Sequence, residues 1–142
     1  PHSPPAAGDR AIGSDIVKPM YELSVQREFT ATHAVTMAGR REPSHSHDWQ
    51  VTAVVSGRRL DEDGILCDFE AVQRRLEEIL RPFENADLNR TRPFDEVNPT
   101  AEHIARHIAE ALAATLPDGA AVTSVSVTEA PGCTATYRTS LT

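Results

Sequence analysis

The sequence lacks an excess of positive charge. Its 142 residues carry 14 lysine and arginine side chains against 21 aspartates and glutamates, which gives a net charge of −7. A protein that binds nucleic acid through a general electrostatic attraction is usually basic, so the composition argues against this class. An anionic ligand would have to be held by a local group of basic side chains. We therefore expect a small-molecule partner and no nucleic acid.

The sequence also lacks a long hydrophobic run and contains little cysteine. No apolar stretch approaches the roughly 20 residues of a membrane-spanning helix, and the first residues show no apolar core of a signal peptide. Cys67 and Cys133 are too few for a disulfide framework, and each lies in or beside a predicted strand, so we expect both to be buried as small apolar side chains. These absences predict a cytoplasmic protein with no membrane partner.

The length and the distribution of apolar residues predict one domain behind an extension. A chain of 142 residues can bury one core but not two. Residues 1–19 contain several prolines and glycines and few apolar residues, whereas a periodic apolar pattern begins at Tyr21. We expect an N-terminal extension over residues 1–19, lying against another surface such as a neighbouring subunit, and a folded domain over residues 20–142.

Alternating apolar and polar residues predict two long strands at the start of this domain. The strand over residues 21–35 has an inward row that ends in His33, and the strand over residues 45–57 has His45 and His47 on one face. An antiparallel pair would bring the three histidines to the same end. Three imidazoles without a fourth protein ligand are the donor set of a catalytic zinc site, in which water or substrate takes the last position. The alternative is that they are ordinary polar loop residues, because H-x-H alone is a weak motif.

Helical periodicity predicts two helices between this strand pair and two further strands. The first helix follows Asp68 as its N-cap and carries a buried apolar stripe from Phe69 to Phe83; the second follows Thr100 as its N-cap. Strands are predicted over residues 123–129 and 133–141, around a turn. The order is strand, strand, helix, helix, strand, strand, which is an α+β fold.

His103 and His107 lie four residues apart on the second predicted helix. This spacing could chelate a metal, but both residues fall on the flank of the buried stripe and have no carboxylate or thiol pattern beside them. We expect them to be solvated.

Six short motifs, taken in order, resemble those of the 6-pyruvoyl-tetrahydropterin synthase family, which includes the 6-carboxytetrahydropterin synthases. They are Phe-Thr-Ala-Thr-His at 29–33, His-Ser-His at 45–47, Gly-Ile-Leu-Cys-Asp-Phe at 64–69, Leu-Asn at 88–89, Asn-Pro-Thr-Ala-Glu at 98–102, and Val-Thr-Glu at 127–129 followed by Tyr137. The resemblance implies the tunnelling fold, a four-stranded antiparallel sheet with two helices on one face. It also implies trimers or hexamers whose active sites lie between subunits.

The resemblance makes His33, His45 and His47 the Zn²⁺ ligands and Glu129 the residue that binds the pterin. A carboxylate suits the pterin because the 2-amino group and the ring N–H present two parallel donors. Most family members place a catalytic cysteine shortly before the paired histidines, but here that loop has no cysteine. Glu42, in an E-x-x-H-x-H arrangement, resembles a variant class in which glutamate replaces it. We therefore expect Glu42 to be the catalytic base.

The family's proton relay also differs in this chain. Its aspartate and histidine align with residues 83–89, where Asn85 takes the place of a residue that transfers a proton, and an amide cannot do so near neutral pH. Asp87, Glu84 and His103 are the candidates to replace it.

The resemblance predicts a zinc-dependent lyase that acts on the side chain of 7,8-dihydroneopterin triphosphate or a related pterin, with cleavage to a 6-hydroxymethyl-pterin as one outcome. Arginines in the loops are candidates to bind the triphosphate: Arg40, Arg41, Arg90 and Arg92. One alternative is a zinc-containing, pterin-binding homologue that has lost turnover. Another is a metal-free oligomerisation domain.

Overall fold

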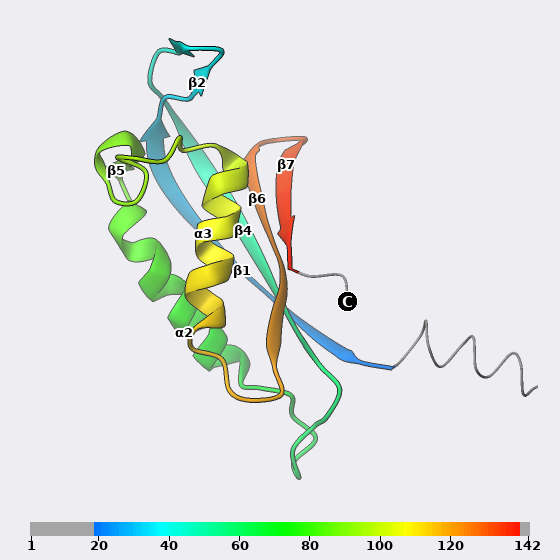
Figure 1. Ribbon diagram of the computed structural model, residues 1–142. Coiled ribbons are helices and arrows are strands. Elements are labelled where there is room, and N and C mark those ends of the chain that lie inside the picture. Colours follow the sequence, from blue (N-terminus) through cyan, green and yellow to red (C-terminus); the bar gives the residue numbers. More distant parts are fainter. Residues whose placement is uncertain (1–18, 140–142) are drawn as a thin grey trace, which may run out of the picture.

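The computed structural model describes residues 19–139, which form a mainly antiparallel sheet covered on one face by two helices (Figure 1). The predicted extension over residues 1–19 therefore lies almost wholly outside the described residues and stays a prediction. The sheet has the strand order β5-β1-β4-β6-β7. Its strands are β1 (Tyr21–His33), β4 (His45–Gly57), β5 (Ala86–Asp87), β6 (Ala121–Ala130) and β7 (Cys133–Arg138).

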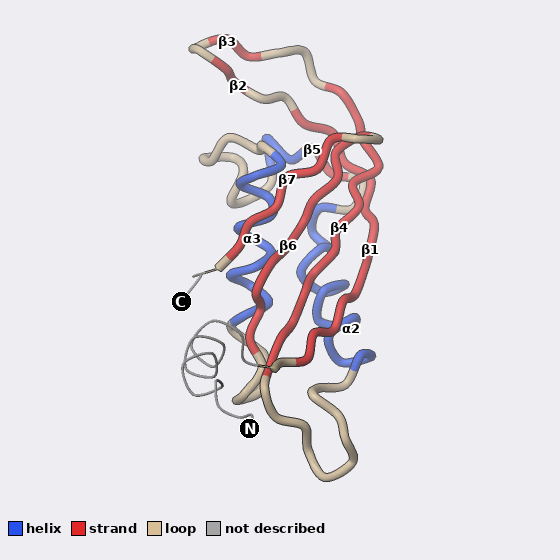
Figure 2. Tube along the Cα trace, turned by 90° about the vertical axis from the view of Figure 1, so that its right-hand side faces the viewer, coloured by secondary structure: helices blue, strands red, loops and turns tan. Residues whose placement is uncertain are grey.

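The predicted α+β fold, with four antiparallel strands and two helices on one face, is confirmed. Strands β1, β4, β6 and β7 are those four, and β5 adds a short parallel pairing to the outer side of β1. A separate hairpin of β2 (Thr36–Met37) and β3 (Arg40–Arg41) projects beyond the end of the sheet (Figure 2). The sequence pattern predicts a loop at this position, and the structure has a short hairpin there instead.

The helices α2 (Phe69–Leu80) and α3 (Ala101–Ala113) begin where their capping residues predict. The Asp68 side chain accepts a hydrogen bond from the backbone of Glu70, and Thr100 accepts one from His103. Helix α2 packs over β1, and α3 packs over β6 and β7 (Figure 1). No helix among the described residues is long and apolar enough to cross a membrane.

The core lies between the sheet and the two helices, because the inward rows of the strands meet the apolar stripes of the helices there. Phe29 and Trp49 stack across β1 and β4 with ring centroids 5.9 Å apart, and both are buried. Ile104 and Ile108 of α3 are also completely buried. The buried apolar side chains of β1 and β4 that face the helices therefore extend along both strands towards the end of the sheet at which the three histidines lie.

Two predictions of burial are wrong. Phe69 is 51% exposed, because it lies in the first turn of α2, over a surface recess beside Tyr21 rather than over the core. Cys133 is exposed, because it begins the edge strand β7 and has a neighbouring strand on only one side. Cys67 does pack against the core, and burial, followed by the nearby Asp68 charge, raises the pKa of its thiol.

Gly57 at the end of β4 lies against the turn that precedes β6. A Cβ atom there would collide with the carbonyl oxygen of Gly119 and a methyl group of Leu66. We expect Gly57→Ala to lower the free energy of unfolding by about 2–3 kcal/mol, measured by urea denaturation. Gly132→Ala is the matched control: it has open space around the Cβ position and a φ of +82°, so it should cost only about 1 kcal/mol from backbone strain. Equal costs would contradict the packing explanation.

Candidate metal centre

The register of the strands brings the three predicted histidines together. His33 at the end of β1 pairs directly with His45 of β4, and His47 pairs with Ala31. Strands β4 and β6 pair last at Gln50 and Thr128, so Glu129 follows directly and faces the same side as His47. The donor atoms of His33, His45, His47 and Glu129 all lie within 4.8 Å of one another and could hold a metal ion, and we name these four residues the metal-binding group for this reason.

Hydrogen bonds to backbone carbonyls define which ring nitrogen carries the hydrogen in two of these histidines. His33 Nδ1 lies 2.8 Å from the Pro99 carbonyl oxygen, and His45 Nδ1 lies 3.1 Å from that of Pro43. A carbonyl can only accept, so each Nδ1 donates its hydrogen and each neutral ring carries a lone pair on Nε2. The two Nε2 atoms are 3.1 Å apart. Two lone pairs at this distance repel each other unless a cation or a proton lies between them.

His47 and Glu129 complete the group. His47 Nε2 is buried and has no hydrogen-bond partner among the described residues, and it lies 3.2 Å from Glu129 Oε2. The same oxygen is 3.7 Å from His33 Nε2. Burial lowers the pKa of His47, while Glu129 acts in the opposite direction. The neutral imidazole is the form that binds a metal ion.

These residues fit a zinc ion. Two imidazole ligands in tetrahedral coordination have nitrogens roughly 3.4 Å apart, since each Zn–N bond is about 2.0–2.1 Å. The observed separation of 3.1 Å between His33 and His45 is close to this value. The carbonyl that holds each Nδ1 is a common outer partner of a metal-binding histidine. Sequence reasoning expected no fourth protein donor, whereas the structure places Glu129 close enough to be one.

Glu42 borders the same group. It follows the β2–β3 hairpin, and its backbone N–H donates to the carbonyl of Val35 at 3.0 Å. Its Oε1 accepts a hydrogen bond from the Val35 N–H at 3.0 Å and lies 3.8 Å from His45 Nε2. The base of the hairpin therefore fixes the predicted catalytic carboxylate beside a histidine of the candidate metal centre.

The other predicted catalytic residues lie in separate places within the chain. Glu84 accepts a hydrogen bond from the Thr30 N–H at the edge of β1, and Asp87 accepts one from the Asn89 N–H, both at 3.1 Å. The Asp87 bond caps a short 3-10 turn over Leu88–Arg90. His103 donates from Nδ1 to the Asn98 carbonyl at 2.8 Å. Within the described chain, none of these three residues belongs to the metal-binding group.

Two asparagines that sequence reasoning did not assign to the site hold the backbone after His33. The side chain of Asn89 donates to the carbonyl of Ala34 and accepts from its N–H, both at 2.8 Å. Asn98 makes the same pair of bonds to Thr36, at 2.9 and 3.0 Å. An amide can do this because it carries both a donor and an acceptor. Both asparagines stand in the quoted motifs, but only the folded chain shows what they bind.

A cavity of about 690 Å³ opens where β4 and β6 separate beyond their last pair. His47 and Glu129 lie on its wall together with Glu28, Asp48 and Gln50. Among the described residues that line it, the only charged side chains are carboxylates, apart from the histidine. The cavity is therefore suited to a ligand that presents N–H donors, and it gives such a ligand access to the metal-binding group.

His107 does not have the solvated position predicted for it. Its ring packs edge-on between Phe83 and Phe94, with centroids 5.7 and 5.6 Å away. Burial lowers the pKa of His107, and the charge of Glu110 partly opposes this. His103, four residues earlier, is exposed as predicted.

The lowered pKa of His107 predicts a loss of stability in acid. His107 in the unfolded chain has its ordinary pKa of 6.5 and therefore binds a proton more readily than His107 in the folded chain. The contribution of His107 to the free energy of unfolding therefore falls as the pH falls. His107→Leu cannot titrate, so its unfolding free energy should fall less between about pH 7.5 and about pH 5, measured by urea denaturation. His103→Leu on the same helix is the control and should keep the wild-type difference. Equal pH dependence in all three proteins would contradict the explanation.

Comparison with known proteins agrees with this architecture. The family model of 6-pyruvoyl tetrahydropterin synthase matches residues 22–140. The chain therefore belongs to the 6-pyruvoyl tetrahydropterin synthase family. Members of this family are lyases that bind pterins and form oligomers. A comparison with curated proteins finds none that matches this sequence.

Solved structures share the fold. The Caenorhabditis elegans 6-pyruvoyl tetrahydropterin synthase is 17% identical with a TM-score of 0.75, over 86% of this chain and 97% of its own. An uncharacterised Wolinella succinogenes protein is 17% identical with a TM-score of 0.70, over 87% and 100%. A variant of the Plasmodium vivax synthase, in which a catalytic glutamate is replaced by alanine, is 15% identical with a TM-score of 0.69, over 87% and 100%.

Proposed function

We propose that this protein is a zinc-dependent lyase that acts on the side chain of 7,8-dihydroneopterin triphosphate or a related pterin. The observation that carries the proposal is the arrangement of His33 and His45. Their Nε2 atoms lie 3.1 Å apart, and each ring is oriented by a hydrogen bond from Nδ1 to a backbone carbonyl. Membership of the family supports the pterin as substrate class. We also propose a cytoplasmic location.

His33, His45 and His47 would hold the zinc ion. When bound there, Zn²⁺ supplies a Lewis acid that makes a hydroxyl of the substrate side chain more acidic. Glu129 would bind the pterin ring, because it lines the large cavity and 31% of its side chain is exposed. Its carboxylate can accept the two parallel N–H donors of the pterin. Ring binding there would direct the side chain of the substrate towards the histidines.

Glu42 would be the general base. Its carboxylate is fixed by Val35 and lies 3.8 Å from His45 Nε2, next to the place where the substrate hydroxyl would bind. A carboxylate is a weak base towards carbon, so removal of a hydroxyl proton is the easier step. The proton of the 2′ hydroxyl passes to Glu42, and the O–H electron pair forms the C2′ carbonyl. The C1′–C2′ bond breaks with its electron pair moving into the pterin, and the two-carbon aldehyde that carries the triphosphate leaves. This retro-aldol cleavage gives a 6-hydroxymethyl-pterin after reprotonation. The catalytic glutamate of the Plasmodium vivax synthase supports a glutamate in this role.

Assembly into a trimer or hexamer is part of the proposal. The outer side of β7, and the outer side of β1 ahead of its pairing with β5, have no partner strand within the described part of the chain, and such open edges commonly pair with another chain. A neighbouring subunit could then bring Glu84 or Asp87 to the site as a proton donor. Arg40 and Arg41, which precede Glu42 on the exposed hairpin, are candidates to bind the triphosphate.

A second function is a pterin-binding homologue without turnover. The observation that favours it is Asn85, which stands where the relay histidine is expected and cannot transfer a proton. The carboxylates of Glu84 and Asp87 are already occupied by backbone N–H groups.

One experiment separates these functions. The purified protein, loaded with zinc, is incubated with 7,8-dihydroneopterin triphosphate, and the products are identified by mass spectrometry; the metal-stripped protein is the control. A 6-hydroxymethyl-pterin that forms only with zinc supports the lyase with side-chain cleavage, whereas triphosphate elimination keeps the lyase and contradicts the retro-aldol step. Tight pterin binding without any product leaves the binding homologue. Absence of zinc binding contradicts both.

A further inference from the structure

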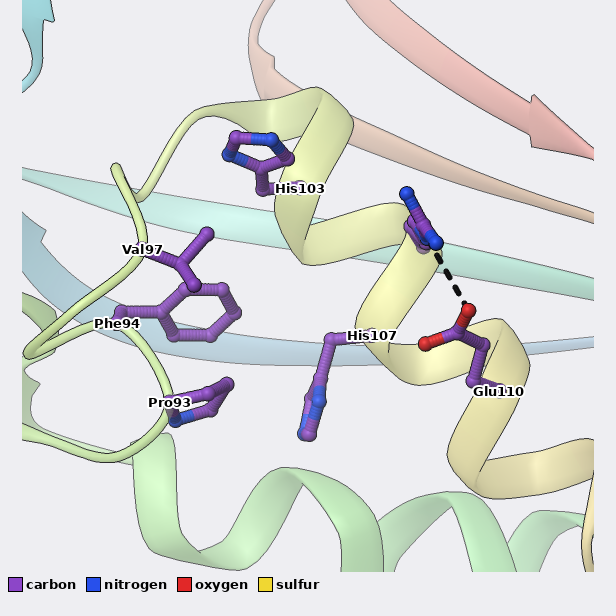
Figure 3. A pocket seen from close by; sticks show the side chains of 7 residues that line it. Pro93, Phe94, Val97, His103, His107 and Glu110 are labelled. Carbon is purple, nitrogen blue, oxygen red and sulfur yellow. Dashed lines mark hydrogen bonds and ion pairs between the residues drawn. The ribbon is translucent and has the colours of Figure 1, made fainter.

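A second cavity, of about 370 Å³, lies on the outer side of the helical layer (Figure 3). Pro93, Phe94 and Val97 from the loop before α3 form one wall, and residues of α3, among them His103 and His107, form the other. None of the four metal-binding residues lines it. Its volume lies in the range of small-molecule sites.

The wall from the loop is apolar and carries an exposed side chain. Val97 is 39% exposed at the cavity, although most large apolar residues in the described part of the chain are covered. Phe94 is buried, and its ring lies edge-on to His107 with centroids 5.6 Å apart. A ligand over the junction of the loop and α3 would cover Val97 and the accessible part of the His107 ring. An aromatic ring can pack against these apolar and aromatic surfaces.

The wall from α3 supplies one oriented positive charge. Arg106 Nε donates to Glu110 Oε2 at 3.1 Å, and this is the only hydrogen bond that the guanidinium makes among the described residues. Its two terminal NH₂ groups remain available, and they present the parallel donors that a carboxylate accepts. The negative charge of Glu110 offsets the positive charge of Arg106, so the local net charge is small. A ligand with one negative charge is therefore favoured over a phosphate dianion.

We propose that this cavity binds a small, planar aromatic carboxylate, with the ring between Val97 and His107 and the carboxylate on Arg106. His103 keeps Nε2 available at the same wall, because its Nδ1 already donates to Asn98. The site is separate from the pterin site and does not depend on the proposed reaction.

The test is a calorimetric titration of the full-length, zinc-loaded protein with 2-naphthoate. Two analogues are controls: naphthalene-2-carboxamide keeps the ring but has no charge, and cyclohexanecarboxylate keeps the charge but has no flat ring. We expect one 2-naphthoate per chain and at least about tenfold weaker binding of both analogues, because each loses one of the two recognised features. Equal affinity for all three compounds would overturn the proposal.

Variants locate the site. Arg106→Met should weaken 2-naphthoate binding at least about tenfold, and Val97→Trp should block the cavity, while Arg74→Met on the exposed side of α2 should have no effect. His45→Ala should retain binding, since the carboxylate does not bind the metal centre. Loss of binding in His45→Ala would assign the ligand to the metal and overturn the proposal. A change of oligomeric state in Val97→Trp, with no naphthoate binding to the wild type, would show that a second copy covers this face.

Discussion

Replacing His45 by alanine is expected to reduce zinc affinity by more than about 100-fold, because changes to the outer partners of metal-binding histidines alone cost about 10–100-fold. The substitution removes one of the two Nε2 atoms that lie 3.1 Å apart and leaves the buried His33 without its partner. The measurement is the zinc content per chain by mass spectrometry, after dialysis against a weak chelator. The wild type should retain one zinc ion per chain, and the variant should retain almost none.

A second readout follows from binding linkage. A metal ion that binds only the folded state raises the melting temperature, so removal of zinc should lower it in the wild type and have little effect in His45→Ala. His103→Ala is the matched control, since His103 is exposed and lies outside the metal-binding group. Full zinc content in His45→Ala, or an equal loss in His103→Ala, would contradict the assignment.

The meeting of the three histidines could be predicted because it depends on local alternation and one strand pairing. Side chains two residues apart in a strand share a face, so the sequence already placed His45 and His47 together and His33 on the inward row. The observed pairing of His33 with His45 confirms this. The helix starts at Asp68 and Thr100 were predictable for a similar reason, because capping is a local interaction.

The position of Glu129 could not be predicted in the same way. It depends on where β6 pairs with β4, which lies about 80 residues earlier in the chain, and on the register shift between Thr128 and Ala130 against β7. A residue face can be read from the sequence, but a distance across non-local strands cannot. The closeness of Glu129 to the three histidines therefore emerged only from the fold.

His107 shows a second limit of sequence reasoning. Its place on the flank of the helix stripe predicted exposure, but Phe83 and Phe94 come from segments outside α3 and cover its ring. Tertiary contacts of this kind have no periodic signal. The same limit applies to Cys133, whose exposure follows from its strand being at the sheet edge.

Glu42→Gln is expected to lower the turnover number by about 100- to 10,000-fold, the usual contribution of a general base. Glutamine keeps an oxygen that can accept the hydrogen bond from the Val35 N–H, so the loop that carries it should hold its shape. What it loses is the ability to take a proton beside His45. The measurement is the rate of product formation from 7,8-dihydroneopterin triphosphate, together with the zinc content of the same sample.

The control for Glu42→Gln is Glu62→Gln, which makes the same chemical change at an exposed glutamate in the loop after β4. It should keep wild-type turnover. Retained turnover in Glu42→Gln would remove this residue from the reaction and leave Glu84 or Asp87 of a neighbouring subunit as the base. Loss of zinc together with turnover would instead show that the carboxylate acts by supporting His45, because a general base can be removed without releasing the metal.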